Sequence, residues 1–89
     1  MSNARTIHKY PIATPLAGIA APRGWRVLTV QMQDDVPTIW AEVNPDAVWD
    51  THLIEVVGTG HPLPDEPRTY LGTVQRGPLV WHVYEVVRG

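Results

Sequence analysis

Cysteine is absent from this 89-residue sequence, and its absence removes several classes of site. Without thiols the chain has neither a disulfide framework nor a thiolate metal site, so zinc ribbons and thiol nucleophiles are excluded. Serine occurs only as Ser2, in the N-terminal tail, so serine-nucleophile chemistry lacks its residue. The two commonest kinds of nucleophilic enzyme are therefore not indicated.

Long apolar runs and clustered charges are also lacking. No stretch approaches the roughly 18 apolar residues of a membrane span, and the N-terminus has no basic and then apolar signal pattern, so we expect a soluble, cytoplasmic protein without a membrane segment. Seven basic and nine acidic residues are scattered singly and give a net charge of -2. Because no basic stripe is available for a phosphate backbone, nucleic-acid binding is disfavoured.

The length sets the scale of the fold. A chain of this size forms one domain with one small core, so its stability is modest or is increased by oligomerisation. Residues 1–4 are small and polar and are predicted to be a flexible tail or a tag remnant. Residues 5–89 are predicted to form a single β domain.

Proline and glycine, by contrast, are frequent, and they divide the chain into short segments with a period of two. Such alternation is typical of β-strands, and no segment has the period of a helix. Residues 13–24 contain too many prolines and glycines for more than a loop. Strands are predicted at residues 5–12, 25–33, 38–43, 50–58, 69–75 and 79–87.

The predicted fold is all-β, either a small six-stranded antiparallel barrel or a two-layer sandwich with hairpin connections. Residues 25–33 and 38–43 form a hairpin through a four-residue connection, and Leu28 is expected to share a face with Val30 and Met32. The first strand is expected at a sheet edge, and the strand at 38–43 is also treated as an edge. Gly72 is expected to lie beneath Trp81 or Tyr70 of a neighbouring strand.

The most distinctive stretch is Gly58-Thr59-Gly60-His61, which follows an apolar strand and precedes Pro62. Two glycines permit a sharp turn, and the proline disfavours a helical conformation at His61, so the imidazole is held on an irregular loop. These four residues form the candidate binding loop. The alternative is that the glycines only make a tight corner and that a nearby carbonyl caps the ring.

The four histidines are candidates for metal ligands or catalytic groups. His52, His61 and His82 converge only if the fold brings them together, and neither a His-Glu-x-x-His motif nor a histidine pair at strand spacing is present. Asp65 and Glu66 lie near His61 in sequence. We predict no catalytic residue, no metal site and no cofactor, with histidines bonded inside the structure as the more common situation.

Four tryptophans in so short a chain are more informative. Tryptophan is enriched at protein interfaces, and a small domain covers four indoles with difficulty. Trp40 and Trp49 are the candidate interface residues, and pairing across a two-fold axis predicts a homodimer. The alternative is that all four indoles lie in or over the core.

Several segments along the chain form a recognisable combination. These are Ile7-His8-Lys9-Tyr10-Pro11, Gln31 with Gln33, Ile39-Trp40-Ala41-Glu42-Val43, Val57-Gly58-Thr59-Gly60-His61, Tyr70-Leu71-Gly72-Thr73-Val74 and Val80-Trp81-His82-Val83-Tyr84-Glu85. Together they resemble a small domain of unknown function found in many bacteriophage and prophage genomes. The resemblance implies a phage-related context and a compact β fold, and it implies no mechanism.

Two functional classes remain open. The first is a non-enzymatic interaction module that binds a protein of the host or the phage, with a homodimer as its expected assembly. The second is a small enzyme or metal-binding domain that uses His61. The first is favoured because no nucleophile and base pair is supplied, while aromatic surface and open sheet edges suit association.

Overall fold

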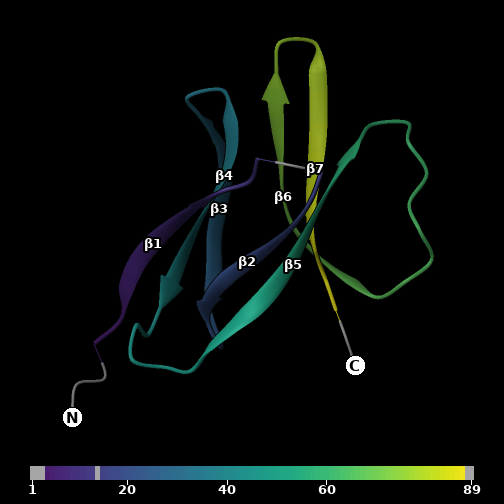
Figure 1. Ribbon diagram of the computed structural model, residues 1–89. Helices are drawn as coiled ribbons and strands as arrows, with labels where there is room; N and C mark the ends of the chain where they lie inside the picture. The colour runs from purple at the N-terminus through teal and green to yellow at the C-terminus, as the bar shows by residue number, and fades with distance from the viewer. Residues whose placement is uncertain (1–3, 14, 88–89) are drawn as a thin grey trace.

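Two antiparallel sheets make up the fold in the computed structural model, which describes residues 4–13 and 15–87. One sheet has the strand order β1-β4-β3 and the other β2-β5-β7-β6 (Figure 1). The strands are β1 Thr6–Pro11, β2 Leu16–Pro22, β3 Arg26–Gln33, β4 Val36–Val43, β5 Trp49–Gly58, β6 Arg68–Arg76 and β7 Leu79–Val86. The all-β prediction is confirmed. Within the described part of the chain, no helix is long and apolar enough to cross a membrane.

The number of strands differs from the prediction, because part of the supposed loop at residues 13–24 is strand β2. Pro22 ends this strand, Gly18 lies within it, and both are tolerated because β2 is at a sheet edge. No ladder joins the two sheets, so the described strands do not close into a barrel. Apart from Ala4, which precedes β1, the predicted tail lies outside the described residues.

The core lies between the sheets and is built mainly from their central strands. Ile39, Ala41 and Val43 alternate along β4 and are fully buried. Ile54 of β5 and Val83 of β7 reach the same apolar cluster from the other sheet. Each fully buried side chain of this size stabilises the fold by about 1.5–3 kcal/mol relative to an exposed one. The period-two patterns thus place these strands correctly.

Tight turns close the two hairpins. Asp34 and Asp35 alone connect β3 to β4, and both have positive φ, 51° and 64°. These are the backbone signs of a type I′ turn, which matches the twist of a hairpin. The predicted four-residue connection is therefore wrong, since Asp tolerates this conformation and the strands extend by two more residues. In the second hairpin Gly77 has φ 56° and Pro78 follows it.

The edges of β3 and β6 face each other across a seam without pairing. Each of the two strands carries a register shift in the ladder with its own partner, at Leu28 between β3 and β4 and at Leu71 between β6 and β7. A bulge bends its strand and leaves a residue unpaired, which prevents a regular ladder from forming. The shift turns Leu28 outward, so its predicted place on the face of Val30 is wrong.

Gly72 has a different neighbour from the one expected. A Cβ at this position would lie 3.1 Å from the Cβ of Val30, which belongs to β3 of the other sheet. The absent side chain therefore allows the two sheets to approach at the seam. Trp81 and Tyr70 do not occupy this space.

Strand β4 is the central strand of its sheet and not an edge. It pairs with β1 on one side and with β3 on the other, so Trp40 lies between Lys9 and Thr29 in the register. The expectation of a free edge at residues 38–43 is wrong. The expected edge position of β1 and central position of β7 are confirmed.

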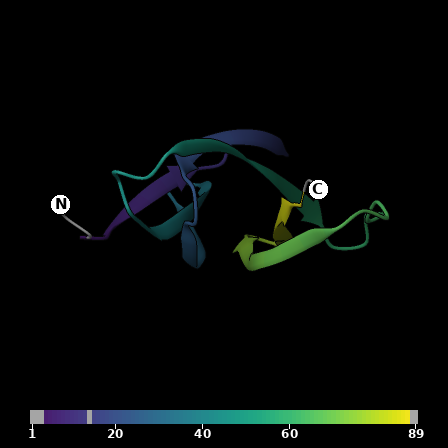
Figure 2. The same ribbon diagram turned by 90° about the horizontal axis from the view of Figure 1, so that it is seen from below.

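The molecule has two ends that differ in construction. The closed end carries the connections from β2 to β3 and from β4 to β5, residues 23–25 and 44–48. The open end carries the turns at residues 34–35 and 77–78, which point the same way in Figure 1. Figure 2 shows the strands as an arch, with β2 and β5 over the top and a strand group on either side.

Candidate functional site

The Gly58-to-His61 stretch forms a turn that ends β5 at the open end. The N–H of His61 donates to the carbonyl of Gly58 at 3.1 Å, and the N–H of Thr59 donates to the carbonyl of Val80 at 3.1 Å. Gly60 has φ 88°, which favours glycine. A Cβ on Gly58 would lie 3.1 Å from the imidazole of His61, so the ring packs directly over this glycine. Gly60 therefore permits the positive φ of the turn, and Gly58 leaves room for the ring of His61.

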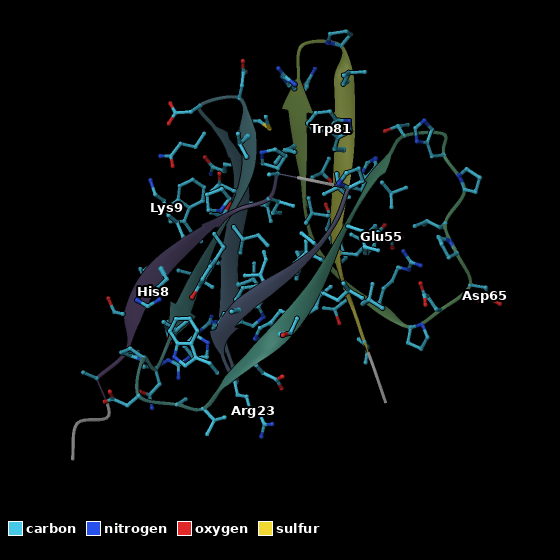
Figure 3. All side chains as sticks on the ribbon, in the orientation of Figure 1. His8, Lys9, Arg23, Glu55, Asp65 and Trp81 are labelled. Carbon is cyan, nitrogen blue, oxygen red and sulfur yellow. The ribbon has the colours of Figure 1, made fainter. Side chains whose placement is uncertain are left out.

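A pocket of about 410 Å³ lies beside this turn, between the two hairpins. Its apolar walls include Ile12, Pro37, Val56 and Trp81, which come from both sheets. In Figure 3 Trp81 lies on β7, close to the turn of the second hairpin. This cavity is called the open-end pocket below. Its size falls within the range of small-ligand sites, which are mostly apolar with a few polar groups.

Three polar side chains supply those groups. His61 lines the pocket from the turn, and Asp35 and Arg76 line it from the two hairpins. The Nε of Arg76 lies 3.6 Å from Oδ1 of Asp35, which links one hairpin to the other. Since Asp35 is mostly exposed, this ion pair contributes little to stability and opens at low cost.

A smaller hollow of about 280 Å³ adjoins the pocket and shares His61 and Trp81 with it. Leu79 lines this hollow and is 51% exposed. The imidazole of His61 thus lies at the boundary of two concave regions with an apolar rim. Such a rim is typical of a surface that meets another protein.

Three of the four histidines are held by hydrogen bonds. Both ring nitrogens of His82 are engaged, Nε2 by the hydroxyl of Thr59 at 2.8 Å and Nδ1 by that of Thr73 at 3.1 Å. His8 shares a bond of 3.1 Å with the hydroxyl of Tyr10. His61 alone makes no side-chain hydrogen bond to another described residue, so it is the imidazole available to a partner.

The fold does not assemble the histidines into a metal site. His52 lies at the closed end, whereas His61 and His82 lie at the open end. Among residues 4–13 and 15–87, no group of three His, Cys, Asp or Glu side chains is placed to hold a metal ion. Asp65 lies out on the loop between β5 and β6 in Figure 3, away from the pocket.

The closed end contains a polar cluster that the sequence analysis did not identify. Oε2 of Glu85 accepts from Nδ1 of His52 at 2.8 Å, and its Oε1 accepts from Nε1 of Trp25 at 3.1 Å. The rings of Trp25 and His52 stack at 4.2 Å between centroids. The second ring nitrogen of His52, Nε2, is buried and has no hydrogen-bond partner among the described residues.

Two groups near this end have shifted pKa values. Burial raises the pKa of Tyr10, whose ring lies 5.5 Å from that of Trp25. The pKa of Asp50 is lowered, chiefly because its carboxylate accepts from the N–H of Thr51 and also from Arg23. Both groups are part of the scaffold and neither lines the open-end pocket.

The long loop between β5 and β6 has a single cationic anchor. Nη2 of Arg68 donates to the carbonyl of Pro64 at 2.7 Å, and its Nη1 forms an ion pair with Glu55. The guanidinium also lies 5.4 Å from the ring centroid of Tyr84. Arg68 is almost buried and fixes the far side of the loop that begins with the candidate turn.

The four tryptophans differ in how far they are buried. Trp25 and Trp81 pack against the core, Trp40 is half-buried on the outer face of β4, and Trp49 is 52% exposed. The alternative that all four lie in or over the core does not hold for Trp49. Its Nε1 lies 3.4 Å from the carbonyl of Pro45, at the closed end.

The geometry of the site does not identify a protein family, but the sequence does. Residues 3–89 match the model of a domain of unknown function, DUF7352. The chain belongs to the DUF7352 family. No curated protein and no solved structure matches this DUF7352 chain. The prediction of a domain of unknown function is thus confirmed, while its phage or prophage setting stays a prediction.

Proposed function

We propose that this DUF7352 protein is a non-enzymatic protein-interaction module, and that the open-end pocket receives an apolar side chain from a partner protein. One observation supports this most: an apolar cavity with an unbonded imidazole, His61, at its rim. Trp81 supplies the largest apolar wall, and indoles dominate the energetics of protein contacts. The resemblance to phage domains suggests a partner from a phage or its host.

A partner protein fits the cavity better than an enclosed small molecule. The pocket continues into the adjoining hollow, and exposed Leu79 extends the apolar surface beyond it. The ion pair between Asp35 and Arg76 is an exposed hydrogen-bonding group that an approaching backbone can meet. Rigid hairpins hold both walls, so little ordering is required on binding.

The alternative of an enzyme or metal-binding domain based on His61 has less support. A general base needs an orienting partner, and no described side chain bonds the imidazole of His61. Asp35, the one carboxylate among the described residues that line the pocket, faces Arg76. The arrangement supplies a hydrogen-bonding imidazole for a partner rather than a nucleophile and base.

Selection of binding peptides from a random displayed library tests the proposal. Peptides that bind with micromolar affinity should shift the NMR signals of the Trp81 indole and of residues 56–61. His61→Ala and Arg76→Ala should each weaken binding by about tenfold, the loss of one polar contact of about 1.4 kcal/mol. Thr29→Ala, on β3 but outside the pocket lining, is the matched control and should leave affinity unchanged.

Two results would contradict the proposal. One is a set of peptides that bind the double variant His61→Ala, Arg76→Ala as tightly as the original protein. The other is a set whose NMR shifts map away from the pocket, to either outer sheet face or to a sheet edge.

A further inference from the structure

Strand β2 is the outer strand of its sheet, and the hydrogen bonds at its two ends show which backbone groups point away from β5. Val56 N–H donates to the carbonyl of Pro15, and Arg23 N–H donates to that of Val48, both at 2.8 Å. In an antiparallel ladder, bonded and non-bonded positions alternate along each strand. Since β2 pairs with β5 in this register throughout, its odd-numbered residues face β5 and Gly18 and Ala20 face outward.

These outward groups are accessible and have no partner among the described residues. Both Gly18 and Ala20 are exposed, and no backbone or side-chain group bonds to their N–H or C=O on the outer side. Beyond β2 no further strand is added to the sheet, which ends there (Figure 2). The segment from Leu16 to Pro22 contains no charged residue.

The other outermost strand, β1, is protected in the usual ways. The bond from Ile12 N–H to the carbonyl of Pro37 fixes the alternation there, so Ile7, Lys9 and Pro11 point their backbone groups outward. Pro11 has no N–H, and Lys9 places a charge at the edge; both features oppose pairing with another strand. Strand β2 has a proline at one outward position, Pro22 at its end, but neither feature at Gly18 or Ala20.

We propose that β2 pairs antiparallel with β2 of a second copy of this chain, across a two-fold axis that passes by Ile19. In this register Gly18 lies opposite the second copy's Ala20, and the two residues exchange their N–H and C=O bonds. The axis repeats the same exchange on its other side. The pairing joins two four-stranded sheets into one continuous sheet.

The edge is suited to a copy of itself because the same axis also brings exposed apolar side chains together. Leu16, Gly18 and Ala20 are exposed on the outer sheet face, Leu16 to 57%, whereas Pro22 at the end of β2 is buried. Leu16 comes opposite the second copy's Pro22, whose neighbour across the ladder is Trp49. Two large exposed side chains, Leu16 and Trp49, thus lie at each end of the joined strands, and no like charges face each other along them.

This pairing goes beyond the proposed function, because β2 contributes no residue to the open-end pocket. Ala20→Pro removes one outward N–H and leaves the ladder to β5 intact, since proline is tolerated where its nitrogen faces away from the sheet. Ile7→Pro makes the same change on the outward side of β1 and is the matched control. Neither variant should alter peptide binding at the pocket.

Sedimentation equilibrium across micromolar concentrations, with circular dichroism to check folding, measures the association. The original protein and Ile7→Pro should reach twice the chain mass of 9.9 kDa. Folded Ala20→Pro should stay at the monomer mass, and Trp49→Ala should weaken association by about tenfold, as expected for an interface indole. A monomeric original protein, or an Ala20→Pro variant that still dimerises, would overturn the proposal.

Hydrogen exchange gives a second measurement that does not depend on a variant. The amides of Gly18 and Ala20 face solvent in a monomer and should exchange fast when the protein is dilute. They should become protected as the concentration rises, while the outward amide of Lys9 in β1 stays unprotected. Equal exchange of Gly18 and Ala20 at all concentrations contradicts the pairing.

Discussion

The two ends of the molecule are built from the same strands but use their polar groups in opposite ways. At the closed end, Glu85 bonds His52 and Trp25 between the sheets, and almost every polar atom of the cluster has a partner. At the open end, the imidazole of His61 has no hydrogen-bond partner in the described part of the chain and borders a pocket. The comparison indicates that the polar groups of the closed end hold the two sheets together, whereas the imidazole of His61 makes no such contact to the described residues.

The difference has an origin in the chain path. Two of the connections between the sheets, from β2 to β3 and from β4 to β5, lie at the closed end, so side chains there are enclosed from several directions. At the open end one connection, from β1 to β2, passes between the sheets, the hairpins finish in two-residue turns, and the ion pair of Asp35 and Arg76 links the two turns. We therefore expect mutations at the closed end to affect stability and mutations at the open end to affect binding.

The largest expected effect is at the closed end. Glu85→Ala leaves Nδ1 of His52 and Nε1 of Trp25 without an acceptor, so the free energy of unfolding should fall by about 3 kcal/mol. Glu85→Gln keeps an acceptor oxygen and should cost clearly less. Urea denaturation measures both. If Glu85→Ala lowered the free energy of unfolding by less than about 1 kcal/mol, the cluster would not have the stabilising role proposed for it.

A smaller effect is expected from the backbone of the open end. Gly60 has φ 88°, so Gly60→Val should lower the free energy of unfolding by about 1–2 kcal/mol. Gly60→Asn, which tolerates positive φ, is the control. Gly58→Val should cost less than Gly60→Val, because the group in its way is the movable ring of His61. If thermal denaturation showed that Gly58→Val destabilises the protein more than Gly60→Val, the roles assigned to the two glycines would be contradicted.

Much of the fold was predictable because its pattern is local. The alternation of Ile39, Ala41 and Val43 places β4 against the core, and the open-end turn was identified from its two glycines. Strand β2 was missed because Gly18 and Pro22 weaken the strand signal, although Ala17, Ile19 and Ala21 do alternate inward. At a sheet edge those residues are tolerated, and the position of an edge is set by the tertiary fold.

The candidate site was predictable only in part. His61 was identified from its own loop, but Asp35 and Arg76 are turn residues whose meeting depends on how two hairpins pack. The bond between His52 and Glu85 joins residues 33 apart in sequence, and no spacing signals it. The positive φ values of Asp34 and Asp35 could not be predicted either, because this turn lacks the Asn-Gly or Asp-Gly sequence that usually indicates a type I′ turn.

At His61 the comparison predicts a change in binding without a change in stability. The side chain is exposed and unbonded, so His61→Ala should alter the free energy of unfolding by less than about 0.5 kcal/mol. The same variant should lose affinity for pocket-selected peptides. Urea denaturation and peptide titration on one preparation test both statements. A loss of stability above 1 kcal/mol would show that the imidazole helps to hold the fold, contrary to its open position.

The smallest effect is expected at Asp50, an exposed carboxylate of the closed end. Its pKa in the folded protein lies below the ordinary 3.8, mainly because of the Thr51 N–H and further because of Arg23. A carboxyl with a lowered folded pKa stabilises the fold above its unfolded pKa, about 3.9, and this contribution is lost as the pH falls through the folded value. Stability of the original protein should therefore decline below about pH 4 slightly more steeply than that of Asp50→Asn. In an NMR titration Arg23→Ala should raise the pKa of Asp50 only part of the way, since the Thr51 bond remains. A midpoint at 3.8 or above in the original protein would contradict the assignment.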